Sequence, residues 1–159
     1  MTYNQIVTEI KTLLESHAMI HSVRFATPIE WLAWEGEPEL PVALFSCNNG
    51  SMNVGRELIY SIKFWFLDKS GVEGEFETEV ISDQHQIAND IVNSLRQNKD
   101  LSIDTQITWD AISEKFEDYL TGVNFTLNIS TIGEFNACDF PTKQTTFGIF
   151  DDSFNLSFN

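Results

Sequence analysis

The sequence predicts an α+β fold, with a mainly antiparallel β-sheet of about five or six strands and two main α-helices packed on it. Two segments carry apolar side chains at helical spacing, and the segments between and after them alternate apolar with polar residues. With 159 residues and 42% hydrophobic content, the chain has the size and composition of one globular domain. We therefore expect no second full domain.

The first main helix is predicted near the start of the chain. Apolar side chains recur at steps of three and four residues from Tyr3 to Leu14, which places them on one stripe. His17 follows at the end of that stripe, where a cation or a polar tip is a more ordinary role than a metal ligand. A short strand is expected over residues 22–26.

A short, capped helix is predicted next. Thr27 can cap it, Pro28 suits its first position, and Glu30 can complete a capping box. Trp31 and Trp34 lie three residues apart and share a face of this helix. The two side chains either pack in the core or contact a partner protein, and core packing is favoured by about two to one.

Two strands are predicted before the second main helix. Residues 40–47 are apolar and begin beside a proline, which suits the first position of a strand. Residues 48–55 carry turn chemistry and are expected to form a long hairpin loop, as are residues 68–75. Apolar residues alternate over 56–67, yet the second face, which includes Trp65, is only half polar. Something is therefore expected to cover that face.

The second main helix is predicted over residues 82–97, which repeat the helical apolar spacing. Residues 101–109 alternate as a strand does, and residues 111–119 are either a strand or an irregular crossing. The cleanest alternation in the chain covers residues 122–130. It predicts a strand with one buried and one wet face.

The last part of the chain is rich in phenylalanine but cannot build a core of its own. We therefore divide the chain into a domain over residues 1–141 and an extended C-terminal arm over residues 142–159. An isolated arm of this kind would expose aromatic rings to water. Folding back over its own sheet and docking on a neighbouring subunit carry equal weight. Residues 140–159 hold five phenylalanines, of which the last four lie in the arm: Phe140, Phe147, Phe150, Phe154 and Phe158.

The chain is acidic along its whole length. Its 9 basic and 24 acidic residues give a formal charge of −15, and residues 1–80 and 81–159 each hold 12 of the acids. Dispersed negative charge repels nucleic acid and anionic membranes, so a duplex-binding role is disfavoured. The surface is either simply solvated or an acidic wall that DNA passes without sticking. No apolar run reaches the ~18–20 residues of a membrane span, and no signal peptide is recognised, so a reduced cytosolic chain is expected.

No catalytic, cofactor-binding or metal-binding residue is predicted. The three histidines lack metal-ligand spacing with the two cysteines, and no glycine-rich phosphate loop occurs. The alternating glutamates of residues 73–79 are interpreted as a solvated, extended edge. A hydrolase with Cys47 or Cys138 as nucleophile would need a histidine partner, which the sequence does not assign.

Several short motifs occur in a characteristic order over roughly residues 1–141. They are Phe66-Leu67-Asp68 followed by Glu79-Val80-Ile81-Ser82-Asp83-Gln84, then Gln86-Ile87-Ala88-Asn89-Asp90-Ile91-Val92, Asp118-Tyr119-Leu120-Thr121-Gly122-Val123, and Asn136-Ala137-Cys138-Asp139-Phe140-Pro141. Together they resemble small virion proteins of tailed phages, especially crAss-like and other phages of Bacteroidetes. The resemblance is to the tail-terminator and head–tail connector class of ring proteins.

This resemblance implies a structural role in the phage neck, after synthesis in the host cytoplasm. Ring proteins of this class assemble about six or twelve copies between portal and tail, contact the adjoining neck, portal and tail proteins, and leave a channel for DNA. DNA passes without sequence-specific binding, and neither a membrane nor a catalytic residue is involved. A ring contact requires apolar surface beyond the core. The interface candidates are Trp31, Trp34, Trp65, Phe147, Phe150, Phe154 and Phe158.

The net charge also supports a second interpretation. An acidic intracellular binding module could mimic the charge of DNA and inhibit a nucleic-acid enzyme of the host. Mimics of this kind usually gather their acids on one surface, whereas the acids of this chain are dispersed along it. We therefore place this interpretation second.

Overall fold

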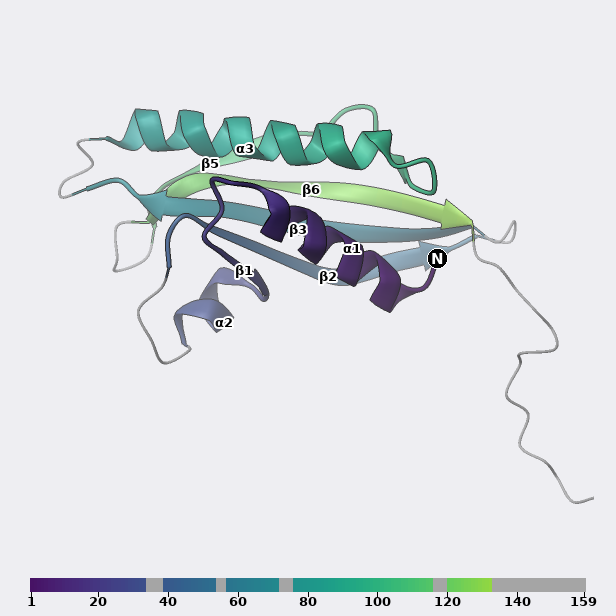
Figure 1. The fold of residues 1–159 in the computed structure, drawn as a ribbon. Coiled ribbons are helices and arrows are strands. Elements are labelled where there is room, and N and C mark those ends of the chain that lie inside the picture. Colours follow the sequence, from purple (N-terminus) through teal and green to yellow (C-terminus); the bar gives the residue numbers. More distant parts are fainter. Residues whose placement is uncertain (34–38, 54–56, 72–75, 116–119, 133–159) are drawn as a thin grey trace, which may run out of the picture.

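The computed structural model describes residues 1–33, 39–53, 57–71, 76–115 and 120–132 (Figure 1). These residues form an α+β fold, as predicted. The elements in chain order are α1 (Tyr3–Ser16), β1 (Ser22–Phe25), α2 (Pro28–Leu32), β2 (Val42–Met52), β3 (Glu57–Lys69), α3 (Glu77–Gln97), β4 (Ser102–Ile103), β5 (Trp109–Lys115) and β6 (Leu120–Ile132).

Within the described residues, the strands form one six-stranded sheet. Its order is β1-β2-β3-β6-β4, and β5 also pairs with β6. Only β1 and β2 run parallel, whereas the other pairs are antiparallel. The predicted mainly antiparallel sheet is therefore confirmed. β3 lies at its centre and pairs with β6 from Glu57 to Lys69.

The main core lies on the face of the sheet that α1 and α3 cover, which we call the helix face (Figure 1). The predicted helical stripes supply one side of this core, because their apolar residues are buried against the sheet. Four phenylalanines from β2, β3 and β6 supply the other side, and their rings stack at centroid distances of 5.1–6.4 Å. They are Phe45, Phe64, Phe66 and Phe125.

A smaller apolar cluster covers one end of the opposite face, which we call the far face. It joins Trp31 of α2 to Leu44, Leu67 and Leu120 of the strands, and Trp65 packs against it. In the described part of the chain, α2 therefore covers the second face of β3 at this end only. At the middle of β3 and β6 the far face is polar, since Lys63 and Thr126 are exposed there.

α2 begins as the sequence predicted. The Thr27 backbone N–H and hydroxyl donate hydrogen bonds to Glu30 Oε2 at 2.7 and 2.9 Å, and the Glu30 N–H donates to Thr27 Oγ1 at 3.4 Å. These bonds satisfy groups that a helix terminus leaves open. Hydrogen bonds from the backbone and then the side chain of Thr27 lower the pKa of the Glu30 carboxyl below its ordinary value of 4.5.

Replacing Thr27 with valine is expected to raise the Glu30 pKa part of the way back toward 4.5, because it removes the hydroxyl donor and keeps the backbone donor. Since the folded-state pKa is lowered, the carboxylate stabilises the fold above pH 4.5, and this contribution is lost as the pH falls through the folded-state pKa. Side-chain carboxyl NMR shifts measure the titration. Thr2→Val, at the other capping box, is the control; an unchanged Glu30 titration in Thr27→Val would contradict the role of the hydroxyl.

Two sequence predictions about element lengths are wrong. The turn chemistry of residues 48–51 does not end β2, which continues to Met52 through a bulge between Cys47 and Asn49. α3 begins at Glu77, five residues before its predicted start at residue 82. Glu77 and Glu79 therefore lie in the first helical turn, where the helix dipole favours acids, and not on an extended edge. Residues 73–75 lie outside the described ranges.

Candidate interaction site

One edge of the sheet is only partly covered. β1 pairs with β2 from Val42 to Phe45 and then ends, whereas β2 continues to Met52 (Figure 1). In the described part of the chain, residues 46–52 have no strand on this side. We call these seven residues the open β2 edge. None of them is charged, so the charge that commonly protects a sheet edge is missing.

Exposed apolar side chains lie beside the open β2 edge. Phe25 ends β1 and is 43% exposed, Tyr3 begins α1 and is 40% exposed, and Met52 ends β2 and is 83% exposed. The Phe25 ring meets that of Phe45 edge-on at 5.1 Å, and the Tyr3 ring lies 6.0 Å from that of Tyr60 on β3. Each aromatic ring therefore touches the core with one side and leaves the other to solvent.

Cys47 of the open β2 edge is half-buried, and burial raises the pKa of its thiol. Burial also raises the pKa of Tyr3, with a smaller contribution from the charge of Cys47. A raised thiol pKa favours the unreactive protonated form at neutral pH. The environment of Cys47 therefore opposes the nucleophile role that the sequence left open.

The other edge of the sheet is interrupted. β4 pairs with Ser130 and Ile129 of β6, and β5 pairs with β6 from Phe125 to Leu120. The single strand predicted over residues 101–109 is thus wrong, because residues 104–108 leave the sheet between β4 and β5. Arg96 Nη2 donates to the carbonyl oxygens of Asp104 and Thr105 at 3.4 and 3.2 Å, which holds this segment near α3.

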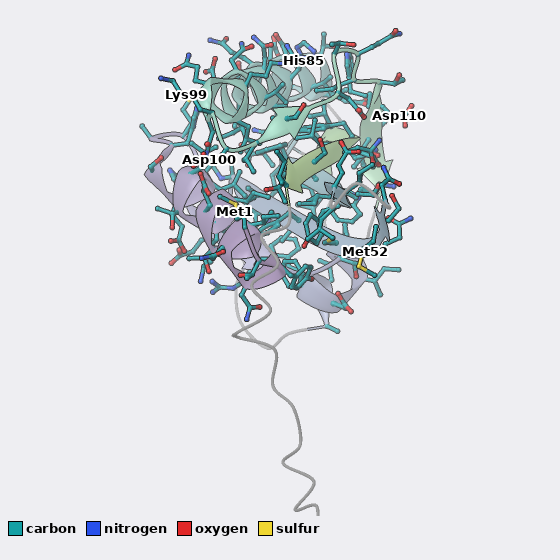
Figure 2. The ribbon with its side chains drawn as sticks, turned by 90° about the vertical axis from the view of Figure 1, so that its right-hand side faces the viewer. Met1, Met52, His85, Lys99, Asp100 and Asp110 are labelled. Carbon is teal, nitrogen blue, oxygen red and sulfur yellow. The ribbon has the colours of Figure 1, made fainter. Side chains whose placement is uncertain are left out.

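A cavity of about 390 Å³ lies under that segment, against α3. Trp109 stands at this cavity, 44% exposed, with its ring centroid 4.6 Å from that of His85. Figure 2 shows His85 and Met52 on opposite sides of the molecule. The apolar residues that line the cavity are Ala88, Val92, Ile107, Trp109 and Phe125.

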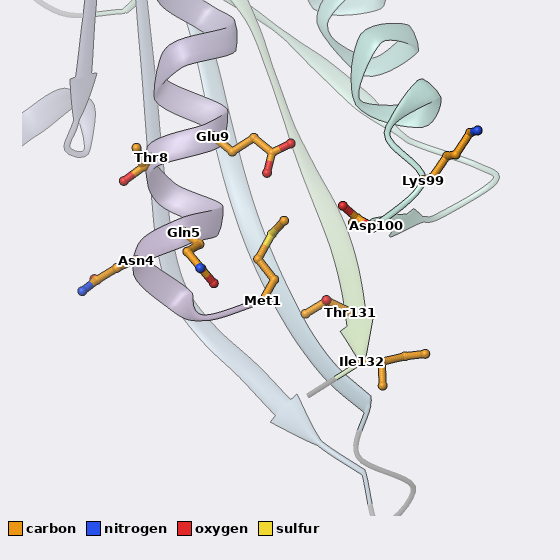
Figure 3. Close-up of a pocket in the computed structure, with 9 residues that line it drawn as sticks. All are labelled: Met1, Asn4, Gln5, Thr8, Glu9, Lys99, Asp100, Thr131 and Ile132. Carbon is orange, nitrogen blue, oxygen red and sulfur yellow. The ribbon is translucent and has the colours of Figure 1, made fainter. Parts of the chain in front are cut away.

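A larger hollow of about 850 Å³ lies between the first turns of α1 and the end of β6 (Figure 3). Its lining combines apolar and polar side chains, with Met1 and Ile132 beside Gln5, Lys99 and Asp100. Glu9 accepts a hydrogen bond from the Asn98 side chain and so joins α1 to the end of α3. Among the described residues, no group of three or more histidine, cysteine or acidic side chains could hold a metal ion.

The predicted interface residues fall into two groups. Trp31 is 7% exposed and packs in the α2 cluster, which is the role that the sequence favoured for it. Trp65 is half-buried beside the same cluster, with Lys63 Nζ 5.4 Å from its ring centroid. The other candidates and Cys138 lie outside the described residues, as do the boundary after residue 141 and the arm: Trp34, Phe147, Phe150, Phe154 and Phe158.

Sequence reasoning did not find Tyr3, Phe25 or Trp109 as surface residues. Tyr3 and Trp109 stand at apolar positions of periodic segments, and periodicity assigns such positions to the core. Phe25 carries one available signal, because the capped helix start at Thr27 limits β1 to a few residues. A strand this short cannot cover a partner of 11 residues.

No protein-family model matches the chain, and no curated protein matches it. In the described part of the chain, none of the helices is both long and apolar enough to span a membrane. The fold and the surface together define an α+β domain with exposed apolar side chains at two opposite edges of its sheet.

Proposed function

We propose that the chain is a structural subunit of a homo-oligomeric ring in the neck of a tailed phage, of the tail-terminator or head–tail connector class. The observation that carries this proposal is the pair of unlike surfaces at opposite edges of one sheet. The first is the open β2 edge with Phe25, Tyr3 and Met52. The second is the cavity beside Trp109.

Two unlike surfaces favour a ring over a two-fold dimer. In a head-to-tail contact, each subunit uses one surface to bind the other surface of its neighbour, and the contact closes into a ring when the rotation permits. A two-fold dimer needs only one self-complementary surface. Aromatic residues are the usual anchors of such contacts, and Phe25 and Trp109 supply one on each side.

The sequence and the charge support the same proposal. The motif order of residues 1–141 resembles ring proteins of the phage neck. A formal charge of −15 on each copy gives an assembled ring a negative surface, which would hold DNA only loosely during passage. Adjoining neck, portal and tail proteins are the expected partners above and below the ring.

Light scattering on the purified chain tests assembly. For the wild type we expect a mass near six or twelve times 18.1 kDa. Trp109→Ser is expected to lower the affinity between copies by about tenfold or more, because truncating an aromatic anchor costs ~1.4 kcal/mol or more of binding free energy. Phe76→Ser is the matched control, because Phe76 is exposed before α3 and its N–H donates to Ser70, which follows the central strand β3. Equal loss in both variants would contradict an anchor at Trp109.

The location in the virion is tested separately. Mass spectrometry of purified particles is expected to recover the chain at about six or twelve copies for each portal. Its absence from virions would overturn the proposed function. Stoichiometric capture of a host nuclease or polymerase by the purified chain would instead establish the inhibitor alternative.

A further inference from the structure

We infer that the open β2 edge accepts residues 153–159 of a neighbouring copy as an added β-strand. The inference rests on the proposed function in one respect, since it requires copies of the chain to adjoin. It assigns a particular segment to the open β2 edge, which is one of the two surfaces named in the ring proposal.

The open β2 edge can pair with an added strand. Its seven residues continue past the end of β1, so among the described residues no strand continues the row of β1 beside β2 from residue 46 onward. An edge strand of this kind presents unpaired N–H and C=O groups that an extended peptide can satisfy. The bulge at Cys47 and Asn49 limits the pairing to some positions without removing the edge.

The sequence of residues 153–159 fits such a strand. Phe154, Leu156 and Phe158 alternate with serine and asparagine, which is the pattern of a strand with one apolar and one polar face. The segment has seven residues, as the open β2 edge does, and it carries no charged side chain. In a chain with a charge of −15, two uncharged segments can approach with little repulsion.

The surface beside the open β2 edge matches the apolar face of that segment. Side chains of an added strand lie next to those of β2 and in line with those of β1. On the helix face, this position adjoins Phe25, Tyr3 and Met52, which are all exposed. An added strand would therefore cover the aromatic rings that α1 and β1 leave partly open.

The connecting length permits binding to a neighbouring copy. Residues 133–152 join the end of β6 to the segment, and 20 extended residues reach up to ~66 Å. The open β2 edge of the same copy is only two strands from β6, or about 10 Å. The connection is much longer than the distance to the open β2 edge of the same copy, so it can also reach this edge on an adjoining subunit.

Amide hydrogen exchange on the full chain tests the inference. At concentrations where copies assemble, exchange at residues 46–52 is expected to slow by about tenfold or more relative to the diluted chain. Leu156→Asp should restore fast exchange, because it places a charge on the apolar face of the segment. Asn155→Asp places the same charge on the polar face and should leave the protection largely intact. Unprotected amides in the assembled chain would overturn the inference.

A mixing experiment separates a neighbouring copy from the same copy. A chain that ends at residue 152 offers an open edge without a donor, and Met52→Lys offers the donor with a charged edge. The two are expected to associate when mixed more strongly than either does alone. Protection that persists unchanged in the isolated monomer would show that each copy covers its own edge, which overturns the inference.

The results of these experiments also distinguish the added strand from the proposed ring. A ring that forms equally well with Leu156→Asp would contradict the added strand and leave the proposed function standing. Strand exchange between copies that form only dimers would support the added strand and contradict the ring.

Discussion

Replacing Gly122 with valine is expected to lower the free energy of unfolding by about 3 kcal/mol or more. A Cβ atom at this position would lie 1.9 Å from the carbonyl oxygen of Phe66 and 2.9 Å from its carbonyl carbon. Both atoms belong to the backbone of β3, which β2 and β6 hold from either side. Since neither atom can rotate away, β6 must separate from β3 to admit the side chain.

Urea unfolding followed by circular dichroism measures this effect. Thr126→Val is the matched control, because Thr126 lies on the same strand with an exposed side chain. We expect the control to stay within about 0.5 kcal/mol of the wild type. A Gly122→Val chain with the wild-type midpoint would show that β3 and β6 do not approach as closely as described.

Periodicity predicts the faces of these elements well and their ends poorly. The stripes of α1 and α3 and the alternation of β6 are correct because each element buries one face against the sheet. At residues 48–51 the local chemistry favours a turn, yet pairing with β3 keeps the chain extended. Gly50 is needed there for another reason, because an added Cβ would lie 2.5 Å from the carbonyl oxygen of Ile59.

The candidate interaction site depends on the ends that periodicity misses. The open β2 edge exists because β1 has 4 residues and β2 has 11, and a strand predicted to stop at residue 47 leaves almost no edge uncovered. The cavity beside Trp109 exists because residues 104–108 leave the sheet. Both features are differences in length between neighbouring strands. A one-dimensional pattern shows which way a side chain faces, but not whether a partner strand reaches it.

The two surfaces have different physical characters, which bears on how copies would recognise each other. The open β2 edge offers backbone groups in a regular row, so it selects for an extended peptide. The cavity beside Trp109 offers a concave apolar lining with one exposed aromatic ring, so it selects for a side chain of matching shape. The two surfaces therefore differ in the partner that each selects. That asymmetry favours head-to-tail assembly over a symmetric pair.

Phe64→Ala is expected to cost about 3–5 kcal/mol of unfolding free energy, because it empties the centre of the core. Phe64 is fully buried on the central strand, and its ring stacks with those of Phe45, Phe66 and Phe125 at centroid distances of 6.2, 6.4 and 5.1 Å. Phe76→Ala removes the same atoms from an exposed position before α3 and should cost less than about 1 kcal/mol. Thermal and urea unfolding of the two variants compare them directly. Because α1 and α3 share this one core, loss of the Phe64 ring should lower the stability of both helices together, and separate transitions for the two helices would contradict a single cooperative core.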